Sequence, residues 1–587
     1  MIFNSRKDGL EDIPSTNSLR FESTRFHPKK SPPNHSYMRT QLFTLLAIAC
    51  LLSLCSCSNE KSYHGSSISD EMGTVDFPVS TNKTARKHFE RGLKLLHHMT
   101  YSEADKEFAA AIEADPEFAA GYWGRAMTIV HPVWPDVPSE DRLRLGWEFL
   151  EKARSASHTS ERESDFIETL AVYFEKGWEK EEKERLEAID LAWDSLSRKY
   201  PQDVEAACFF ALFHLAPARF KPSDDSYSSQ RLAGSVVEAV LEKIPNHPGA
   251  LHYQIHAYDF PALADRALEM CASYGAVAPD VPHALHMPTH IFTRAGYWEK
   301  SIEYNLKSAE ASKRLHSHDD EMDVPYIHAL DYAVYAYLQL GMQQEALRIR
   351  DEVFARKGPF ISSNKVGGAF AYSSIPARCA LETQDWEAAA RLEKRQPEWF
   401  PWGDDFLGQE SIINFAIAIG ALRSENLDIA KSEIAEHKAM AIRIAEKFPN
   451  TYWDSQAKTQ QLTLLAWLDY REERPDLAVK KMKEAADLEN ATEKEAVTPG
   501  EVLPAGELLG DMLFELERYE EAIDAYQSVL ERSPNRFYSL YGIGRAAEAN
   551  GDSDTARQYY KLLTDLSKDA NPQNDRVKNA QRYLASL

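Results

Sequence analysis

The chain has 587 residues, of which 91 are acidic and 67 are basic, so its formal net charge is −24. A hydrophobic content of 43% excludes a disordered chain, because that much apolar side chain can form a large core. The acidic balance argues against a nucleic-acid partner, because no excess of basic side chains is present to neutralise phosphates. The six cysteines contain no CxxC pair, so they predict neither a zinc finger nor a disulfide framework.

The N-terminal segment 1–56 is organised like a targeting sequence. Residues 1–37 are polar and lack periodicity, and the character of the sequence changes at Met38. Met38 and Arg39 precede the apolar run 42–54, which small residues follow, and this pattern is typical of a secretory signal peptide. The run is short for a transmembrane helix. We expect residues 1–37 to precede the true translation start and residues 38–56 to be the signal peptide.

A lipid anchor is predicted directly after this segment. The residues Leu-Cys-Ser-Cys that end at Cys57 resemble a bacterial lipobox, whose last cysteine is acylated after cleavage. Cys50 fits less well, because Ala47 stands where leucine is usual, and Ser58 resembles the outer-membrane sorting class. The resemblance implies lipidation at Cys57 and a protein of the bacterial cell envelope, anchored at the outer membrane with its face undetermined. An uncleaved N-terminal anchor is the alternative.

The mature chain is more acidic than the whole chain, and it begins with a polar stretch. Loss of residues 1–56 removes seven basic and four acidic residues, which leaves a net charge of −27. Residues 57–81 are Ser-rich and mostly polar. We predict that they form a flexible tether.

A repeat of small and aromatic residues begins after the tether. Gly92, Ala104, Phe108, Ala111 and Pro116 have the spacing of the tetratricopeptide repeat, which this segment resembles. Small residues at positions 8 and 20 let two helices approach closely, the aromatic residue at position 24 fills the gap to the next repeat, and proline ends the second helix.

The same frame recurs to the C-terminus. One repeat carries Gly510, Ala522 and Tyr526, and Gly544 with Tyr560 takes the equivalent positions of the next repeat. No segment has the alternating pattern of a strand. The sequence therefore predicts an all-α tetratricopeptide-repeat superhelix, an α-solenoid of antiparallel helix pairs in one extended array. Its predicted parts are N-terminal repeats with a Pro-rich insertion, central repeats with a histidine-lined groove, degenerate repeats and C-terminal repeats, over residues 82–244, 245–357, 358–490 and 491–587.

Five histidines are concentrated in the short segment 252–290 of the central repeats. They are His252, His256, His283, His286 and His290. His252 and His286 are separated by one repeat length, and so are His256 and His290. With repeats starting at 248 and 282, these pairs therefore occupy positions 5 and 9.

The resemblance to tetratricopeptide arrays implies that positions 2, 5, 9, 12 and 13 line the concave groove. His283 takes position 2, Asp259 position 12 and Arg294 position 13, and a repeat starting near 327 adds His328 and Asp331 at positions 2 and 5. We therefore predict groove-binding residues. They are His252, His256, Asp259, His283, His286, His290, Arg294, His328 and Asp331.

Two interpretations of the histidines remain open. They could form a structural layer, bonded to each other or to a ligand. Alternatively, imidazoles at i and i+4 share a helix face and could ligate a transition metal, zinc or copper, through His252, His256, His286 and His290. Asp259 or Asp331 would then be a further ligand or would orient an imidazole. No Glu stands beside either pair, so the zinc-protease pattern is absent, no catalytic residue is assigned, and a non-enzymatic role is favoured.

One segment points to a narrower resemblance. His286-Met287-Pro288-Thr289-His290-Ile291-Phe292, followed by Arg294, resembles a widespread group of bacterial tetratricopeptide-repeat proteins without an established activity. The resemblance supports the fold and leaves the function open. We predict an envelope-anchored scaffold that binds a protein or peptide in its concave groove. The alternatives are a metal-binding protein or metal-dependent enzyme that uses the histidine cluster, and a surface nutrient-binding lipoprotein.

Overall fold

The computed structural model describes residues 68–587, except residues 135, 221–225, 316–319, 363 and 496. The predicted leader, the signal peptide, Cys57 and the first part of the tether lie outside the described residues. In the part that is described, no helix is both long and apolar enough to span a membrane.

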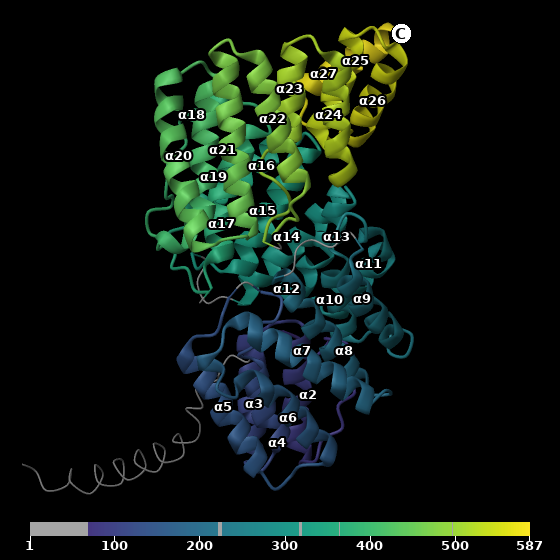
Figure 1. The fold of residues 1–587 in the computed structure, drawn as a ribbon. Helices are drawn as coiled ribbons and strands as arrows, with labels where there is room; N and C mark the ends of the chain where they lie inside the picture. Colours follow the sequence, from purple (N-terminus) through teal and green to yellow (C-terminus); the bar gives the residue numbers. More distant parts are fainter. Residues whose placement is uncertain (1–67, 135, 221–225, 316–319, 363, 496) are drawn as a thin grey trace, which may run out of the picture. The chain divides into compact units, whose positions relative to one another are not determined.

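Helices make up the regular structure of the described chain, which contains no β-strand (Figure 1). Residues 82–244 contain α2 (Lys83–His97), α3 (Tyr101–Ala114), α4 (Ala119–Met127), α5 (Glu140–Ser155), α6 (Glu161–Phe174), α7 (Glu182–Lys199), α8 (Val204–Leu215) and α9 (Ser228–Leu241). The central repeats contain α10 (Pro248–Tyr258), α11 (Leu268–Val277), α12 (Pro282–His286), α13 (Pro288–Arg294), α14 (Trp298–Leu315), α15 (Val324–Gln339) and α16 (Gln343–Ala355).

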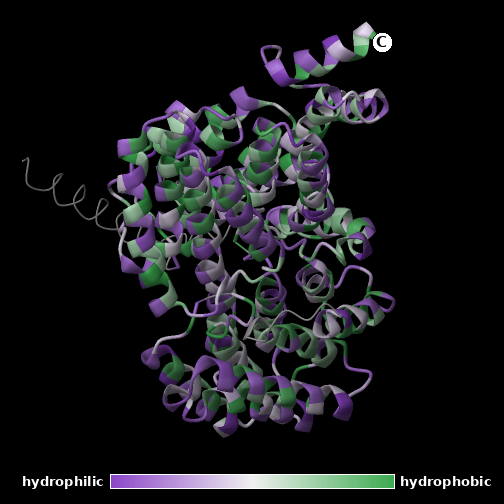
Figure 2. Cartoon of the chain, turned by 45° about the horizontal axis from the view of Figure 1, so that its top comes forward, coloured by the Kyte–Doolittle hydropathy of each residue, from purple (hydrophilic) through white to green (hydrophobic). Residues whose placement is uncertain are grey.

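The second half continues the series of helix pairs. It contains α17 (Val366–Leu381), α18 (Trp386–Ala390), α19 (Leu407–Arg423), α20 (Leu427–Lys447), α21 (Tyr452–Arg471), α22 (Pro475–Asn490), α23 (Ala505–Glu515), α24 (Tyr519–Arg532), α25 (Phe537–Ala549), α26 (Ser553–Leu566) and α27 (Asp575–Ser586). Short 3₁₀ helices lie in some connections of the described chain. They are η1 (Gly177–Glu179), η2 (Pro217–Phe220), η3 (Ala264–Arg266) and η4 (Asp404–Phe406). Most helices carry both hydrophilic and hydrophobic residues along their length (Figure 2), as amphipathic helices do.

The small and aromatic positions of the repeat make the contacts that their spacing predicts. A Cβ added to Gly92 would lie 2.9 Å from the ring of Phe108, and one added to Gly124, in the next repeat, would lie 2.5 Å from the same ring. At the other end of the chain, Gly510 and Gly542 approach the ring of Tyr526 in the same way. Each aromatic ring therefore fills the space between two successive repeats, which only glycine leaves wide enough.

The predicted tether is wrong for the residues that the structure describes. Met72 is 1% exposed and Phe77 is 6% exposed, and both belong to the N-terminal core. The backbone N–H of Thr74 donates to the carbonyl of Asn246 at 3.2 Å, and that of Asp76 donates to Oε1 of Glu205 at 3.0 Å. Residues 68–81 are packed because their few apolar side chains match the core, a feature that the polar composition of the segment concealed.

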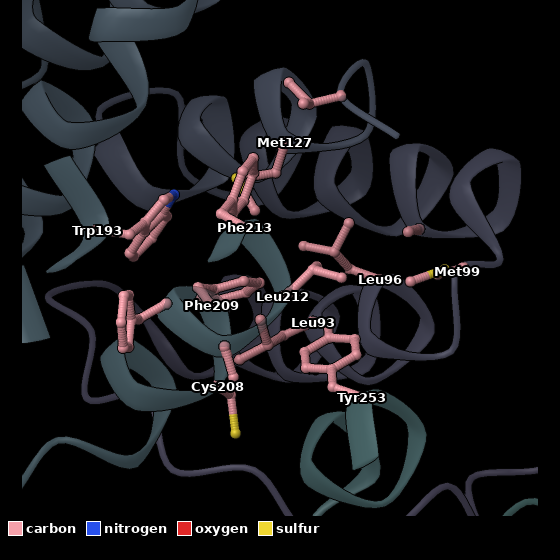
Figure 3. Close-up of a cluster of buried hydrophobic side chains, with 14 of the residues drawn as sticks. Leu93, Leu96, Met99, Met127, Trp193, Cys208, Phe209, Leu212, Phe213 and Tyr253 are labelled. Atoms are coloured by element: carbon pink, nitrogen blue, oxygen red, sulfur yellow. The ribbon is translucent and has the colours of Figure 1, made fainter. Parts of the chain in front are cut away.

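Repeats distant in the sequence share a core in the first half of the molecule. Leu93 and Leu96 of α2 lie beside Phe209 and Phe213 of α8, and Tyr253 of α10 faces the same cluster (Figure 3). A simple solenoid has contacts only between neighbouring repeats. Here α2 packs against α10, and its His97 contacts Phe209 and Glu205 of α8.

The C-terminal repeats also return to the middle of the chain. Nε1 of Trp298 donates to the carbonyl of Asn535 at 2.9 Å, and the backbone N–H of Asn571 donates to the carbonyl of Gly341 at 3.3 Å. The expectation of an extended array is therefore wrong, because the superhelix is tight enough for its last repeats to contact α13–α15.

Candidate functional site

The predicted histidines lie on three consecutive first helices of the repeats. His252 and His256 are on α10, and His328 is on α15 (Figure 1). The repeat between these two has its first helix divided into two pieces, because Pro288 lacks a backbone N–H and begins a new helix. α12 therefore ends at His286, and α13 contains His290.

The first three-histidine constellation consists of His252, His256 and His283. One ring nitrogen of each lies within 4.8 Å of the others. Nε2 of His256 is 3.1 Å from Nε2 of His252, and Nδ1 of His252 donates to the carbonyl oxygen of His97 at 2.7 Å. Nε2 of His283 is buried without a hydrogen-bond partner among the described residues. We call this group constellation I.

The second constellation consists of His286, His290 and His328, again with one ring nitrogen of each within 4.8 Å of the others. Nε2 of His286 is 3.0 Å from Nε2 of His290. Nδ1 of His286 is 2.7 Å from Oδ1 of Asn305, and Nδ1 of His290 is 2.9 Å from Oδ2 of Asp259. Nδ1 of His328 is buried and has no partner in the described chain. We call this group constellation II.

Burial keeps the imidazoles of both constellations neutral. It lowers the pKa of His252 and of His328 to about 3, and it also lowers those of His256, His283, His286 and His290. Neighbouring imidazoles lower several of these values further, because two buried positive charges would repel. Neutral imidazole is the form that ligates metals and the form that accepts a hydrogen bond.

Asp259 joins constellation II to two cations. Its carboxylate accepts from Nε of Arg294 at 2.9 Å and from Nζ of Lys494 at 3.1 Å, besides the imidazole of His290. Burial alone would raise the pKa of Asp259, but Lys494 and Arg294 hold it well below its usual range. Burial lowers the pKa of Lys494 to about 8. The prediction that Asp259 could orient an imidazole agrees with this geometry.

A connection from the second half of the chain covers the predicted groove face. Residues 491–495 and 497–504, between α22 and α23, form this crossing segment. Its Lys494 reaches Asp259, the carbonyl of Thr498 accepts from the hydroxyl of Tyr332 at 3.2 Å, and the carbonyl of Gly500 accepts from Arg378 at 2.6 Å. The face predicted to hold a partner is therefore in contact with the chain itself. Its role in groove binding stays a prediction.

Asp331 does not join the imidazoles. Oδ1 of Asp331 accepts from the hydroxyl of Ser374 at 2.6 Å and lies 3.7 Å from Nε of Arg378, both on α17. Burial raises the pKa of Asp331 to about 6, although Arg378 and Ser374 act in the opposite direction. The structure thus brings all six histidines, Asp259 and Arg294 into one region and directs Asp331 toward α17.

A third buried group was missed from the sequence. Oε2 of Glu205 is 2.8 Å from Nε2 of His97, and its Oε1 is 3.2 Å from Nε2 of His247. The other ring nitrogen of His97 meets the hydroxyl of Tyr253 at 2.9 Å. Burial lowers the pKa of His97, whereas the nearby Cys208 and Glu205 raise that of His247 despite its burial. All polar atoms here have partners, so the group acts as a structural tie between α2, α8 and α10.

A cavity of about 510 Å³ was also missed, and an irregular helix creates it. α18 has 5 residues, whereas the second helices on either side, α16 and α20, have 13 and 21. Residues 391–406 continue as a connection, so they leave open the space that a full-length helix would fill. Residues of α17, α19 and α20 line the cavity together with this connection. The degenerate repeats predicted over residues 358–490 were the available hint, since a degenerate repeat often departs from regular packing.

Four buried polar atoms in the cavity lining lack a hydrogen-bond partner among the described residues. They are the hydroxyl oxygens of Tyr372 and Ser373, Oε1 of Glu410 and Oδ1 of Asn414. The remaining lining is mixed: apolar residues such as Trp402, Ile413 and Met440 stand beside charged residues such as Lys394 and Arg443. The cavity thus combines apolar surface with polar side chains, as ligand sites do.

Comparison with known proteins supports the repeat. The tetratricopeptide repeat family matches residues 507–575, from α23 to the start of α27. The crystal structure of the yeast Tom70 is 13% identical and covers 86% of this chain and 96% of that chain, with a TM-score of 0.25. That TM-score is too low to indicate a shared overall arrangement. A comparison with curated proteins finds no match. With the glycine–aromatic contacts between repeats, the family match confirms the predicted fold class, an all-α tetratricopeptide-repeat superhelix.

Proposed function

We propose that the protein is an interaction scaffold of the bacterial cell envelope, which holds a segment of a partner protein at the cavity beside α18. Helical repeats of this kind present surfaces for binding other proteins. The observation that carries the proposal is the cavity, with its volume of about 510 Å³ and four buried polar atoms without partners among the described residues. The histidine-lined face is a less suitable surface, because the crossing segment already contacts it.

The lining of the cavity indicates the chemistry of the partner. A buried polar group without a partner costs about 1–3 kcal/mol, so a ligand that pairs with it recovers that free energy. The hydroxyls of Tyr372 and Ser373 can donate to carbonyl oxygens, while Oε1 of Glu410 and Oδ1 of Asn414 can accept from N–H groups. A peptide backbone supplies both, and an apolar side chain fits the apolar remainder. A protein segment therefore uses the cavity better than a polar nutrient does.

Anchoring to the envelope is the second element of the proposal. The Leu-Cys-Ser-Cys sequence that ends at Cys57 supports a lipid anchor, and small residues follow the apolar run in the order that a signal peptide requires. The first helix of the described residues begins at Lys83.

The cavity is tested by filling it from its rim. Ala439 of α20 is exposed and lines the cavity, so Ala439→Trp can enter it without disturbing the core. Ala435→Trp, one turn earlier on the same helix and also exposed, is the matched control. Partners are captured from envelope extracts by the full chain and quantified by mass spectrometry. We expect Ala439→Trp to lose at least about 90% of a partner that wild type and Ala435→Trp retain, and equal capture by all three would contradict the proposal.

Anchoring is tested separately. Cells that express the full chain are fed an alkyne-tagged fatty acid, and the protein is examined for label and for membrane association. Cys57→Ala should lose both, whereas Cys50→Ala should keep both. Label that persists in Cys57→Ala would place the anchor elsewhere or refute it.

A further inference from the structure

The two histidine constellations are the same arrangement, built twice by the repeat. Each takes positions 5 and 9 of one repeat and position 2 of the next. In constellation I these are His252, His256 and His283; in constellation II they are His286, His290 and His328. The difference between them lies in the hydrogen bonds that the outer ring nitrogens make.

In constellation II the outer partners fix the proton on Nδ1 of both buried imidazoles. The amide nitrogen of Asn305 donates to the carbonyl of Ser301 at 2.8 Å, so its Oδ1 faces His286 and can only accept. The carboxylate of Asp259 likewise only accepts from His290. His286 and His290 therefore both donate from Nδ1, and a neutral imidazole that does so carries a lone pair on Nε2.

The two Nε2 lone pairs consequently face each other at 3.0 Å with no proton between them. Two acceptors at this distance repel unless a positive centre lies between them. Additional protonation would bury an imidazolium near Lys494 and Arg294, and Asp259 is already shared between those two cations. A metal ion supplies the positive centre through the lone pairs that are present. In a tetrahedral zinc site, ligand nitrogens about 2.0–2.1 Å from the ion lie about 3.3 Å apart.

A third ring completes the set. His328 places a ring nitrogen within 4.8 Å of a ring nitrogen of His286 and of His290, and its buried Nδ1 has no partner among the described residues. His328 is partly exposed, whereas His286 and His290 are buried. We propose that His286, His290 and His328 bind a transition-metal ion of the zinc and copper class, with the carboxylate of Asp259 and the amide of Asn305 holding two of the rings in the ligating orientation.

Constellation I does not require an ion. The carbonyl of His97 fixes the proton of His252 on Nδ1, but no acceptor among the described residues fixes that of His256. His256 can therefore carry its proton on Nε2 and donate it to Nε2 of His252 at 3.1 Å. The pair is satisfied as two neutral rings. This makes constellation I an internal control with the same residue types and nearly the same geometry.

The surroundings also select the kind of ion. Arg294 and Lys494 both lie beside Asp259, so the site has no surplus negative charge to attract cations in general. Calcium and magnesium prefer oxygen ligands, whereas neutral imidazoles suit zinc and copper. The selectivity of the site for its ion therefore comes from its nitrogen ligands.

The test measures zinc binding to the full chain, purified without a histidine tag and stripped with a chelator. Isothermal titration calorimetry with Zn²⁺ and metal analysis after dialysis give affinity and stoichiometry. We expect one tightly bound ion in wild type, and a fall in affinity of more than about 100-fold in His290→Gln and in His328→Gln, which exceeds the usual effect of losing an outer partner. His256→Gln in constellation I and His158→Gln, in the exposed connection before α6, should keep the wild-type ion.

Co²⁺ provides an independent readout, because its visible absorption reports nitrogen ligation, and the band should vanish in the two constellation II variants. The proposal is overturned if wild type binds no zinc, or if His290→Gln and His328→Gln bind it as wild type does. Circular dichroism identifies a variant that fails to fold. If His290→Gln does so, His328→Gln decides, because the buried Nδ1 of His328 has no hydrogen bond to lose within the described chain.

Discussion

Two buried polar regions of the molecule differ in how completely their groups are paired. In the ionic cluster, the guanidinium of Arg536 donates to Glu382 and Glu507 at 2.8 Å and to the hydroxyl of Tyr335 at 2.9 Å. In constellation II, two ring nitrogens at 3.0 Å have lone pairs but no proton to share. The residues of the ionic cluster are buried, and so are His286 and His290.

The difference distinguishes a structural role from a binding role. Arg536 lies before α25, Glu382 follows α17, and Tyr335 lies on α15, so the ionic cluster ties the C-terminal repeats to the middle of the chain. Its groups are paired within the protein, and removing one leaves the others in a buried environment without compensation. The histidine constellations have groups left over, which a ligand can use.

The largest effect should follow loss of the guanidinium. Arg536→Met leaves two carboxylates buried without their cation, which costs about 3–5 kcal/mol of unfolding free energy. Arg557→Met is the control, because Arg557 is 61% exposed and pairs with Asp554 at the surface, so its loss should change stability by less than about 1 kcal/mol. Urea unfolding followed by circular dichroism measures both. Equal stability of the two variants would show that the ionic cluster does not hold the repeats together.

The second prediction concerns the backbone where the C-terminal repeats contact the middle of the chain. Gly296 has a φ of +71°, and an added Cβ would lie 2.4 Å from the carbonyl oxygen of Pro534. Gly551 has a φ of +79° with nothing within 4 Å of an added Cβ. Both alanine variants incur the left-handed strain of about 1–2 kcal/mol, and only Gly296→Ala also pushes the C-terminal repeats away. We expect Gly296→Ala to lose at least about 1 kcal/mol more unfolding free energy than Gly551→Ala, measured by thermal or urea unfolding. Identical losses would show that the contact with Pro534 rearranges without cost.

The third prediction uses pH to examine an incompletely paired carboxyl group. The pKa of Asp331, raised to about 6 by burial, lies above its ordinary value of 3.8. Between these values the folded state holds a proton that the unfolded state releases, so stability falls as pH rises from about 4 to 6 and then levels off. Asp331→Asn should remove that slope, a difference on the order of 2–3 kcal/mol between pH 4 and pH 7. A variant profile parallel to that of wild type would refute the raised pKa.

The smallest effect is expected where a polar atom has no partner to lose. Nε2 of His283 in constellation I is buried and unpaired within the described residues, so His283→Leu removes a group that already contributes no hydrogen bond. Stability in the absence of metal should change by less than about 1 kcal/mol. A loss as large as that of Arg536→Met would show that His283 makes an essential contact and would remove the contrast between the two regions.

Much of the site was predictable, because helical repeats place residues by register. The separation of one repeat length between His252 and His286 put their rings at equivalent positions, and the structure brings them to one region together with Asp259. The partners that decide their protonation came from outside the repeat frame. Asn305 lies on a second helix, and Lys494 is 235 residues from Asp259. No periodicity within the central repeats indicates either one.

By itself the sequence determined the helical pairing, because glycine at Gly92 and Gly510 and aromatic rings at Phe108 and Tyr526 define a local packing rule that acts between neighbouring repeats. It also determined which faces carry the histidines. Only the tertiary structure decided that residues 68–81 are packed, that the crossing segment covers the histidine face and that Arg536 closes the array. The physical reason is the curvature of the superhelix. Small rotations accumulate over many repeats, and they determine which distant residues meet.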